Sequence, residues 1–295
     1  MQVNEFMAMV ESLIVQCQAP AHARSLVEGF INGIHRGIFS GSGTEFMQYR
    51  PYHQGDELKH LDWKLYARVG EKQIRLYREE TNCHCWFVLD MSSSMSYRNN
   101  TSKVSKFEYA CLYIACLGWL SIKQGDSIGL IAYNEKVNAF VEPGSRRDTL
   151  ETIVLALLKL TPAGQANHPT MFSTLQEHIG NRGKLSVLSD MLDFDDTLLG
   201  CFKHLTVLHH DVELLQVLDP YEQDFPFKGG QQFVDIETGQ IIETAALEVK
   251  DLYQLRMSEH LKKLQDTAIQ SQLHYKLMLS DQPIAQYLMA KGDLS

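Results

Sequence analysis

The sequence predicts an α/β fold with a doubly wound, mostly parallel sheet that follows an amino-terminal elaboration. From residue 83 onward, short apolar runs alternate with longer segments in which apolar residues recur at helical spacing. The apolar runs are continuous, which is typical of strands buried on both faces. With 295 residues, 44% of them hydrophobic, the chain can bury a large core. We therefore predict an elaboration at residues 1–82 and an α/β domain at residues 83–295.

The first 82 residues give mixed signals. Apolar residues at helical spacing run from Val3 to Leu13 and recur near residues 26–34. A glycine-rich segment at residues 37–43 then interrupts this pattern. Residues 73–81 alternate in polarity as a strand does. These elements do not show the alternation of strands and helices found after residue 83, and we therefore assign them to the elaboration.

The elements of the main domain follow one another in a regular order. Strands are predicted at residues 85–89, 127–133, 137–141, 185–188, 212–218 and 274–279, with 137–141 at an edge. Helices are predicted at residues 103–123, 148–160, 172–179, 197–208, 247–269 and 284–290, and a hairpin at 229–242. This alternation predicts a parallel sheet with helices on both faces.

Composition and charge argue against several classes of protein. The net charge is −9, from 27 basic and 36 acidic residues, which argues against nucleic-acid binding. Residues 1–11 hold two carboxylates and no basic residue, unlike a secretory signal. The most apolar stretch, residues 110–122, is too short for a membrane span. We expect a cytoplasmic protein that does not cross a membrane.

Polar residues follow two of the predicted strands where each strand ends. Asp90, Ser92 and Ser94 come after residues 85–89, and Asp190 comes after residues 185–188. Ligands of such sheets bind at the carboxyl ends of the strands, where these loops converge.

A threonine, Thr170, lies in the loop between these two segments of the sequence. Together these side chains offer only oxygen ligands, which suit Mg²⁺ first and also Mn²⁺ or Ca²⁺. Because the hydroxyl ligands are neutral, the cation would keep positive charge and attract an external carboxylate. His168 lies near this loop, and we expect its side chain to be solvated.

The pattern Asp90-x-Ser92-x-Ser94 after an apolar strand resembles the metal-ion-dependent adhesion site (MIDAS) of von Willebrand factor A domains. In those domains two serines and a distant threonine contact the metal, and the aspartates act directly or through water. The resemblance assigns these roles to Asp90, Ser92, Ser94, Thr170 and Asp190. The family usually has glycines before its threonine and an acidic or amide residue after it. Here Pro169 and Met171 flank Thr170, so Asn167 is a competing ligand.

Further motifs resemble the "domain of unknown function 58" family over most of residues 24–243. They are Phe39-x-Gly41-x-Gly43-x-Glu45-Phe46, Arg50-x-Tyr52-x-x-Gly55-Asp56, Leu61-Asp62-Trp63-x-x-x-Ala67-Arg68, Ser189-Asp190, His210-Asp211-Val212 and Asp219-Pro220-Tyr221-Glu222. The resemblance implies a partner of a MoxR-type AAA+ ATPase that assists the assembly or maturation of other proteins. This chain would be the non-enzymatic adaptor, since it lacks the Gly-x-x-x-x-Gly-Lys-[Ser/Thr] motif of such ATPases.

Two alternatives remain open. The serines and aspartates could be capping residues of a metal-free, purely structural interaction domain. Residues 193–197 also match the Asp-x-Asp-x-Thr pattern of haloacid-dehalogenase-like phosphatases, in which the first aspartate, here Asp193, is the nucleophile. That motif should follow its strand directly, yet Met191 and Leu192 intervene after Asp190. A serine hydrolase is less favoured still, because the sequence has no Gly-x-Ser-x-Gly motif and no histidine is placed to serve Ser92 or Ser94.

Overall fold

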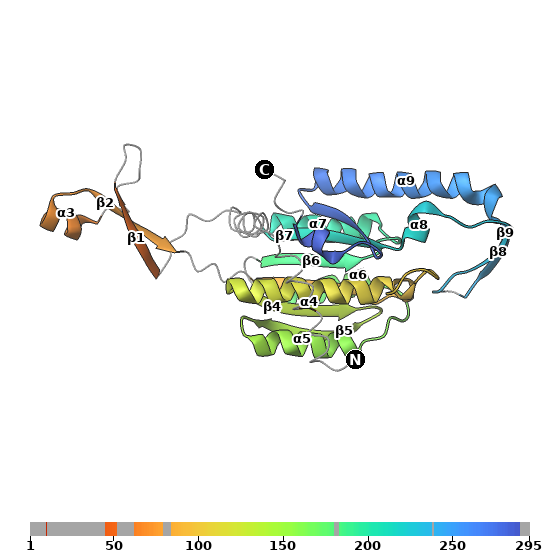
Figure 1. Cartoon of the computed structure of the whole chain (residues 1–295), viewed down its shortest axis with the longest axis horizontal. Coiled ribbons are helices and arrows are strands. Elements are labelled where there is room, and N and C mark those ends of the chain that lie inside the picture. Colours follow the sequence, from red (N-terminus) through yellow and green to blue (C-terminus); the bar gives the residue numbers. More distant parts are fainter. Residues whose placement is uncertain are drawn as a thin grey trace. The chain divides into compact units, whose positions relative to one another are not determined.

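Figure 1 shows a computed structural model of the chain, which describes residues 10, 45–51, 62–78, 84–179, 183–237 and 239–289. The chain divides into two compact units: residues 31–82, and residues 1–30 together with 83–295. The helical segments predicted before residue 35 lie outside the described residues, except for Val10, which is helical and buried. The domain boundary predicted after residue 82 stays a prediction.

The smaller unit holds a two-stranded antiparallel sheet and a short helix. Strand β1 (Glu45–Pro51) pairs with β2 (Gln73–Arg78), and α3 (Trp63–Val69) lies between them in the sequence. The carboxylate of Asp62 accepts hydrogen bonds from the backbone of Lys64 and Leu65, both at 3.0 Å, and so caps α3. Asp62, part of one family motif, is therefore a structural residue.

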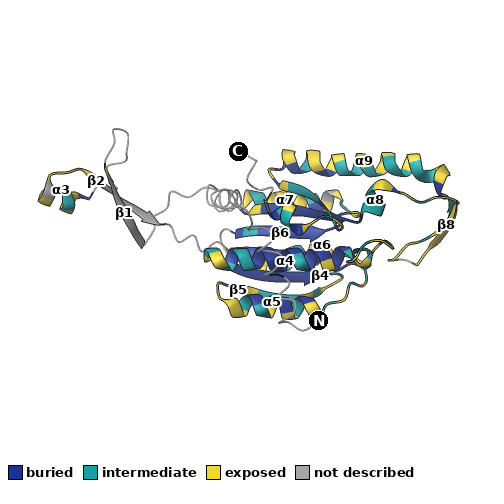
Figure 2. Cartoon of the chain, viewed as in Figure 1, coloured by how far each residue is buried: buried dark blue, intermediate teal, exposed yellow. Residues whose placement is uncertain are grey.

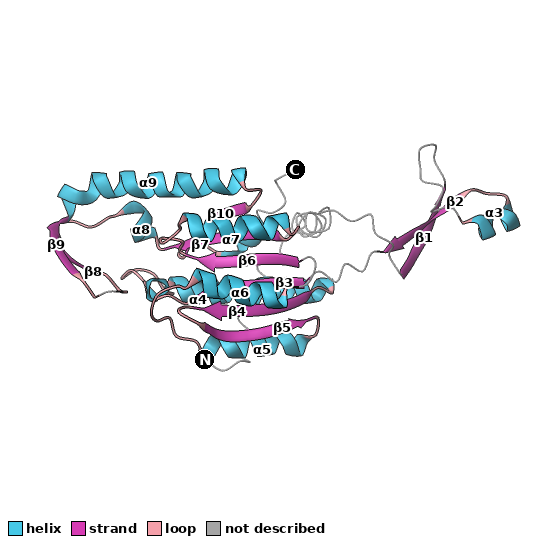
Figure 3. Cartoon of the chain, turned by 180° about the vertical axis from the view of Figure 1, so that it is seen from behind, coloured by secondary structure: helices cyan, strands magenta, loops and turns pink. Residues whose placement is uncertain are grey.

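The larger unit is built on a six-stranded sheet, which confirms the predicted α/β class. The strand order is β10-β7-β6-β3-β4-β5, and every pairing is parallel except that of β4 with the edge strand β5. The strands are β3 (His84–Asp90), β4 (Ser127–Tyr133), β5 (Val137–Gly144), β6 (Gly183–Ser189), β7 (Asp211–Leu218) and β10 (His274–Leu279). Figure 3 shows them from behind as one layer between helices.

Helices cover both faces of this sheet, and most of the buried residues lie between them and the strands (Figure 2). The helices are α4 (Lys106–Gln124), α5 (Arg147–Lys159), α6 (His168–His178), α7 (Asp196–Val207), α9 (Ala246–Gln270) and α10 (Ile284–Met289). Successive side chains of β3 point to opposite faces of the sheet, as expected for a strand, and therefore pack in two separate parts of the core. Trp86 packs in one cluster with residues of α6, α7 and α9, whereas Phe87 faces Gly118 of α4. Within the described ranges, no helix is both long and apolar enough to cross a bilayer.

Four short elements, two helical and two extended, complete the described part of the unit. The 3₁₀ helix η2 (Ser93–Ser96) follows β3, and α8 (Pro220–Asp224) follows β7. Strands β8 (Gly230–Val234) and β9 (Ile241–Ala245) then form the predicted hairpin as a separate two-stranded sheet. Helix α6 begins four residues before its predicted start because Asn167 caps it and Pro169 occupies its first turn.

Candidate functional site

Loops from three parts of the chain meet at the carboxyl edge of the central strands. Backbone hydrogen bonds join the segment after β3 to the loop before α6: Ser93 donates to Gly164 at 2.8 Å, and Ala163 donates to Met91 at 2.9 Å. Met91 in turn donates to Tyr133, the last residue of β4, at 2.7 Å. The loop that carries the predicted serines is therefore fixed to its neighbours by main-chain contacts.

Asp90 ends β3 with a side chain that is almost completely buried, in a residue that is 1% exposed. One carboxylate oxygen accepts from the backbone N–H of Ser92 and the other from the hydroxyl of Ser189, both at 2.7 Å. Burial, followed by the negative charge of Asp190, raises the pKa of Asp90 to about 6, although these hydrogen bonds oppose the shift. Asp90 is thus held by neutral donors, and its charge is poorly compensated.

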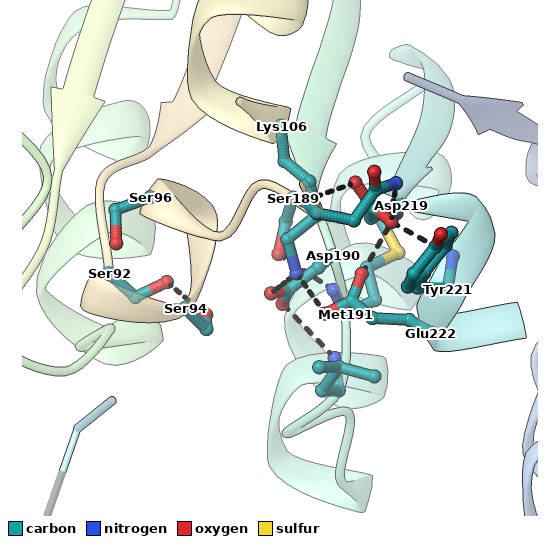
Figure 4. A network of polar contacts seen from close by, with 12 residues as sticks. Ser92, Ser94, Ser96, Lys106, Ser189, Asp190, Met191, Asp219, Tyr221 and Glu222 are labelled. Carbon is teal, nitrogen blue, oxygen red and sulfur yellow. Dashed lines mark hydrogen bonds and ion pairs between the residues drawn. The ribbon is translucent and has the colours of Figure 1, made fainter. Parts of the chain in front are cut away.

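The two predicted serine ligands lie next to each other at the start of η2. The hydroxyl oxygens of Ser92 and Ser94 are 3.0 Å apart and point toward one another in Figure 4. Ser92 is buried, whereas Ser94 is partly exposed. The hydroxyl pair therefore extends from the buried Asp90 towards solvent.

Asp190 follows β6, and its carboxylate forms an ion pair with a buried lysine that the sequence alone did not point to. The ammonium of Lys106 lies 2.8 Å from the carboxylate of Asp190 and 2.6 Å from that of Glu222 (Figure 4). Burial opposes the charged form of Lys106, but both carboxylates outweigh it and raise the pKa of the ammonium. Burial also raises the pKa of Glu222, against the effect of Lys106. Lys106 thus fixes one oxygen of Asp190 on the side of α8.

The turn after Asp190 is unusually tight. Met191, which is 1% exposed, has a φ of 53°, a left-handed conformation that costs energy in a residue with a side chain. The backbone N–H of Met191 donates to the Ser189 hydroxyl at 3.0 Å, and Gln216 donates to the Asp190 carbonyl at 2.8 Å. Several elements therefore hold Asp190 in place.

Thr170 lies half-buried in the first turn of α6. Its backbone N–H donates to the Asn167 side chain at 3.1 Å, so this competing candidate is the cap of the helix. Within the described residues, no recorded hydrogen bond joins Thr170 to Asp90 or Asp190. The structure thus brings Asp90, Ser92, Ser94 and Asp190 to one edge, whereas metal binding by Thr170 stays a prediction.

The expectation that His168 is solvated was wrong. His168 is 7% exposed, and its ring lies between the hydroxyl of Tyr133, at 3.0 Å, and the carboxylate of Asp193, at 2.9 Å. Burial disfavours its charged form, but Asp193 outweighs burial and raises the pKa of His168. The ring is buried because the cap at Asn167 places residue 168 inside the first turn of α6.

The phosphatase pattern falls on residues with structural partners. Asp193, the nucleophile in that alternative, is paired with His168. Asp195 caps α7 through a 2.8 Å hydrogen bond from the backbone of Leu198.

The donor set at this edge fits a hard divalent cation. In the described part of the chain, no three His, Cys, Asp or Glu side chains are grouped to hold a metal. A cation here would therefore depend on the hydroxyls of Ser92 and Ser94 beside the two aspartates. Oxygen donors of this kind suit Mg²⁺, Mn²⁺ or Ca²⁺. Among the described residues, the negative charge of Asp90 is buried without a cationic partner, and this supports the fit. A divalent cation would offset the repulsion between Asp90 and Asp190.

Comparisons with known proteins identify the same family that the sequence motifs resemble. The family described as "Protein of unknown function DUF58" matches residues 48–263, well over half of the chain. An uncharacterized protein of Mycobacterium tuberculosis is 25% identical over 222 residues, which cover 74% of this chain and 68% of that protein. An uncharacterized protein of Mycobacterium bovis matches to the same extent, with 25% identity over 222 residues.

Solved structures with a similar arrangement include BatB from Bacteroides thetaiotaomicron. That likeness has a TM-score of 0.47 and 15% identity, and covers 71% of this chain and 96% of that one. The VWA domain of SpRpn10 has a TM-score of 0.45 and 12% identity, with coverage of 72% and 99%.

Proposed function

We propose that this chain, which belongs to the DUF58 family of proteins of unknown function, is a non-enzymatic adaptor that binds a protein partner through a divalent cation. The observation that carries the proposal is the meeting of Asp90, Ser92, Ser94 and Asp190 at the carboxyl edge of the sheet, with Asp90 buried and poorly compensated. Thr170 would complete the ligand set. Mg²⁺ is the expected cation, and Mn²⁺ or Ca²⁺ would also suit the oxygen donors.

The residues around these ligands would determine how the cation behaves. The backbone of Ser92 and the hydroxyl of Ser189 orient Asp90, and Lys106 draws one oxygen of Asp190 away from the serines. With neutral hydroxyls among its ligands, a bound cation keeps net positive charge. It would therefore supply a binding point for an aspartate or glutamate of the partner.

The proposed partner is a MoxR-type AAA+ ATPase, and the proposed role is assistance in assembly or maturation of other proteins in the cytoplasm. The support for this part is the family resemblance. A metal-free interaction domain is the competing proposal, because Asp90 and the serines also stabilise the turn between β3 and α4.

Titration calorimetry with Mg²⁺ and Mn²⁺ tests the cation site. We expect the unaltered chain to bind one cation and Asp90→Asn to lose that binding while it still unfolds cooperatively. Asp251→Asn, an exposed carboxylate on α9, is the matched control and should bind like the unaltered chain. Absence of binding by the unaltered chain, or equal binding by Asp90→Asn, would favour the metal-free alternative.

Affinity capture from the native cell tests the partner. An AAA+ ATPase should be recovered with Mg²⁺ present, and should be lost on chelation or with Asp90→Asn. Recovery that is unaffected by both would show that the partner binds without the cation. If no AAA+ ATPase is recovered under either condition, the proposed partnership is wrong.

A further inference from the structure

The β8–β9 hairpin and the first half of α9 are packed together by aromatic side chains. The ring of Phe233, in β8, stacks on Phe225 with centroids 5.5 Å apart, and the ring of Phe225 lies 4.5 Å from that of Tyr253, in α9. Where α9 begins, the backbone N–H of Ala246 donates to the carbonyl of Gly229 at 2.9 Å. Residues 230–255 therefore form one hairpin–helix unit, held from the side on which Phe225 lies.

Large apolar side chains are exposed on this hairpin–helix unit. Of the fifteen exposed large hydrophobic residues in the described part of the chain, seven lie within it: Val234, Ile236, Ile241, Ile242, Leu247, Leu252 and Leu255. Figure 2 shows exposed residues, in yellow, along both the hairpin and α9. Apolar residues exposed singly are normal on a protein surface, whereas a concentration of them marks a binding surface.

The leucines of α9 lie on the outer side of the helix. Leu255 is two residues after Tyr253 and so lies about 200° around the helix from it, away from the aromatic packing. Leu252 precedes Leu255 by three residues and adjoins it on that side. Between Ala246 and Leu264 the helix has no buried residue. A ridge of leucines of this kind is the surface against which another helix packs.

The charge of the unit indicates what kind of helix fits. Residues 230–249 contain no lysine, arginine or histidine and four acidic residues, all with exposed side chains: Asp235, Glu237, Glu243 and Glu248. The basic residues that follow contribute little positive charge to this surface, because Lys250 is half-buried and Arg256 lies 3.7 Å from the carboxylate of Glu259. An acidic apolar surface is complementary to a basic apolar one.

We propose that the hairpin–helix unit binds a basic amphipathic helix of a partner protein, with Leu252 and Leu255 at the centre of the contact. A lipid surface fits less well, because helices that lie on membranes carry lysine and arginine, and anionic lipids repel carboxylates. In a contact between two copies of the chain, the same carboxylates would face one another. This binding does not use the proposed cation, and it therefore goes beyond the proposed function.

The test uses the full-length chain and a labelled synthetic peptide with leucine and lysine at amphipathic helical spacing. Fluorescence anisotropy should show binding that weakens as salt is added and that is unaffected by a chelator. The same peptide with glutamate in place of lysine should not bind. Leu252→Ser/Leu255→Ser should weaken binding of the lysine peptide at least about tenfold, since residues at the centre of a contact carry most of its affinity.

Leu155→Ser/Leu158→Ser is the matched control, because these leucines of α5 are also exposed and three residues apart in a helix. The control should bind the lysine peptide like the unaltered chain. If both double variants bind equally well, the peptide is attracted only to the net negative charge, and the proposal is wrong. It is also wrong if the unaltered chain does not bind the peptide.

Two further measurements separate the other possible occupants of the surface. The chain should not sediment with vesicles of phosphatidylserine and phosphatidylcholine, and it should remain monomeric in analytical ultracentrifugation. Binding to the vesicles that is lost in Leu252→Ser/Leu255→Ser would assign the surface to lipid. Self-association that is lost in the same variant would assign it to a second copy. Either result would overturn the proposal.

Discussion

At the scale of single residues, Lys106 determines how Asp190 is held. Its ammonium is fully buried and bridges two carboxylates that come from different parts of the chain, Asp190 after β6 and Glu222 in α8. Removing one partner of a buried ion pair leaves an uncompensated charge in a region of low polarity. The effect of Lys106 on stability should therefore be much larger than that of an ordinary surface lysine.

We predict that Lys106→Met lowers the free energy of unfolding by about 3 to 5 kcal/mol, because Asp190 and Glu222 lose their cation. Urea denaturation would measure this change. Lys103→Met, an exposed position just before the same helix, should change stability by less than about 0.5 kcal/mol. Equal effects of the two substitutions would mean that the bridge contributes nothing to folding.

The residues of the candidate site differ in how far the sequence could predict them. Asp90, Ser92, Ser94 and Asp190 could be found because each directly follows an apolar strand whose end faces the site. Lys106 could not, since its contacts depend on where α4 lies in space relative to β6 and α8. No local pattern marks such long-range pairs.

At the scale of elements, two glycines illustrate how close the packing is in different parts of the fold. A side chain at Gly129, in β4, would lie 3.0 Å from ring carbons of Trp86 and 3.0 Å from the Val141 carbonyl oxygen. A side chain at Gly200, in α7, would meet no atom within 4 Å. The same substitution should therefore have opposite effects at the two positions.

We predict that Gly129→Ala lowers the free energy of unfolding by about 1 to 3 kcal/mol, because β4 is confined between β3 and β5. Gly200→Ala should raise it by about 0.5 to 1 kcal/mol, since alanine is the better helix former. Thermal or urea unfolding of both variants would measure these changes. Stabilisation by Gly129→Ala would contradict the close approach of Trp86 to the strand.

The elements of the main sheet were predicted well because their signals are local. Apolar runs of strand length became β3, β4, β6, β7 and β10. The start of α6 was missed because its cap, Asn167, and its proline were assigned to the preceding loop. Strand β1 and helix α3 were also missed. Strand β1 depends on pairing with β2, which lies more than twenty residues later in the chain.

At the scale of the whole molecule, the proposed cation links binding to folding. A ligand that binds the folded state alone stabilises it by mass action. The ligands come from the ends of β3 and β6, with Thr170 predicted from the start of α6, so they can meet only when the sheet has formed.

We predict that saturating Mg²⁺ raises the free energy of unfolding, by about 2.7 kcal/mol when free Mg²⁺ is about a hundredfold above its dissociation constant. Thermal unfolding with Mg²⁺ and with a chelator would measure the difference. Asp90→Asn should lose the effect, and Asp251→Asn should keep it. A shift of equal size in Asp90→Asn would point to a general salt effect.

The bridge from Glu222 through Lys106 to Asp190 has a mechanical consequence. Helix α9 has 25 residues and is thus a stiff rod about 37 Å long, with Leu247, Leu252 and Leu255 exposed along it. The hydroxyl of Tyr253, on α9, donates to the backbone carbonyl of Glu222 at 2.7 Å and so attaches this rod to the bridge. A force applied to the outer surface of α9 would therefore reach Asp190 through Glu222 and Lys106, far from where the force was applied.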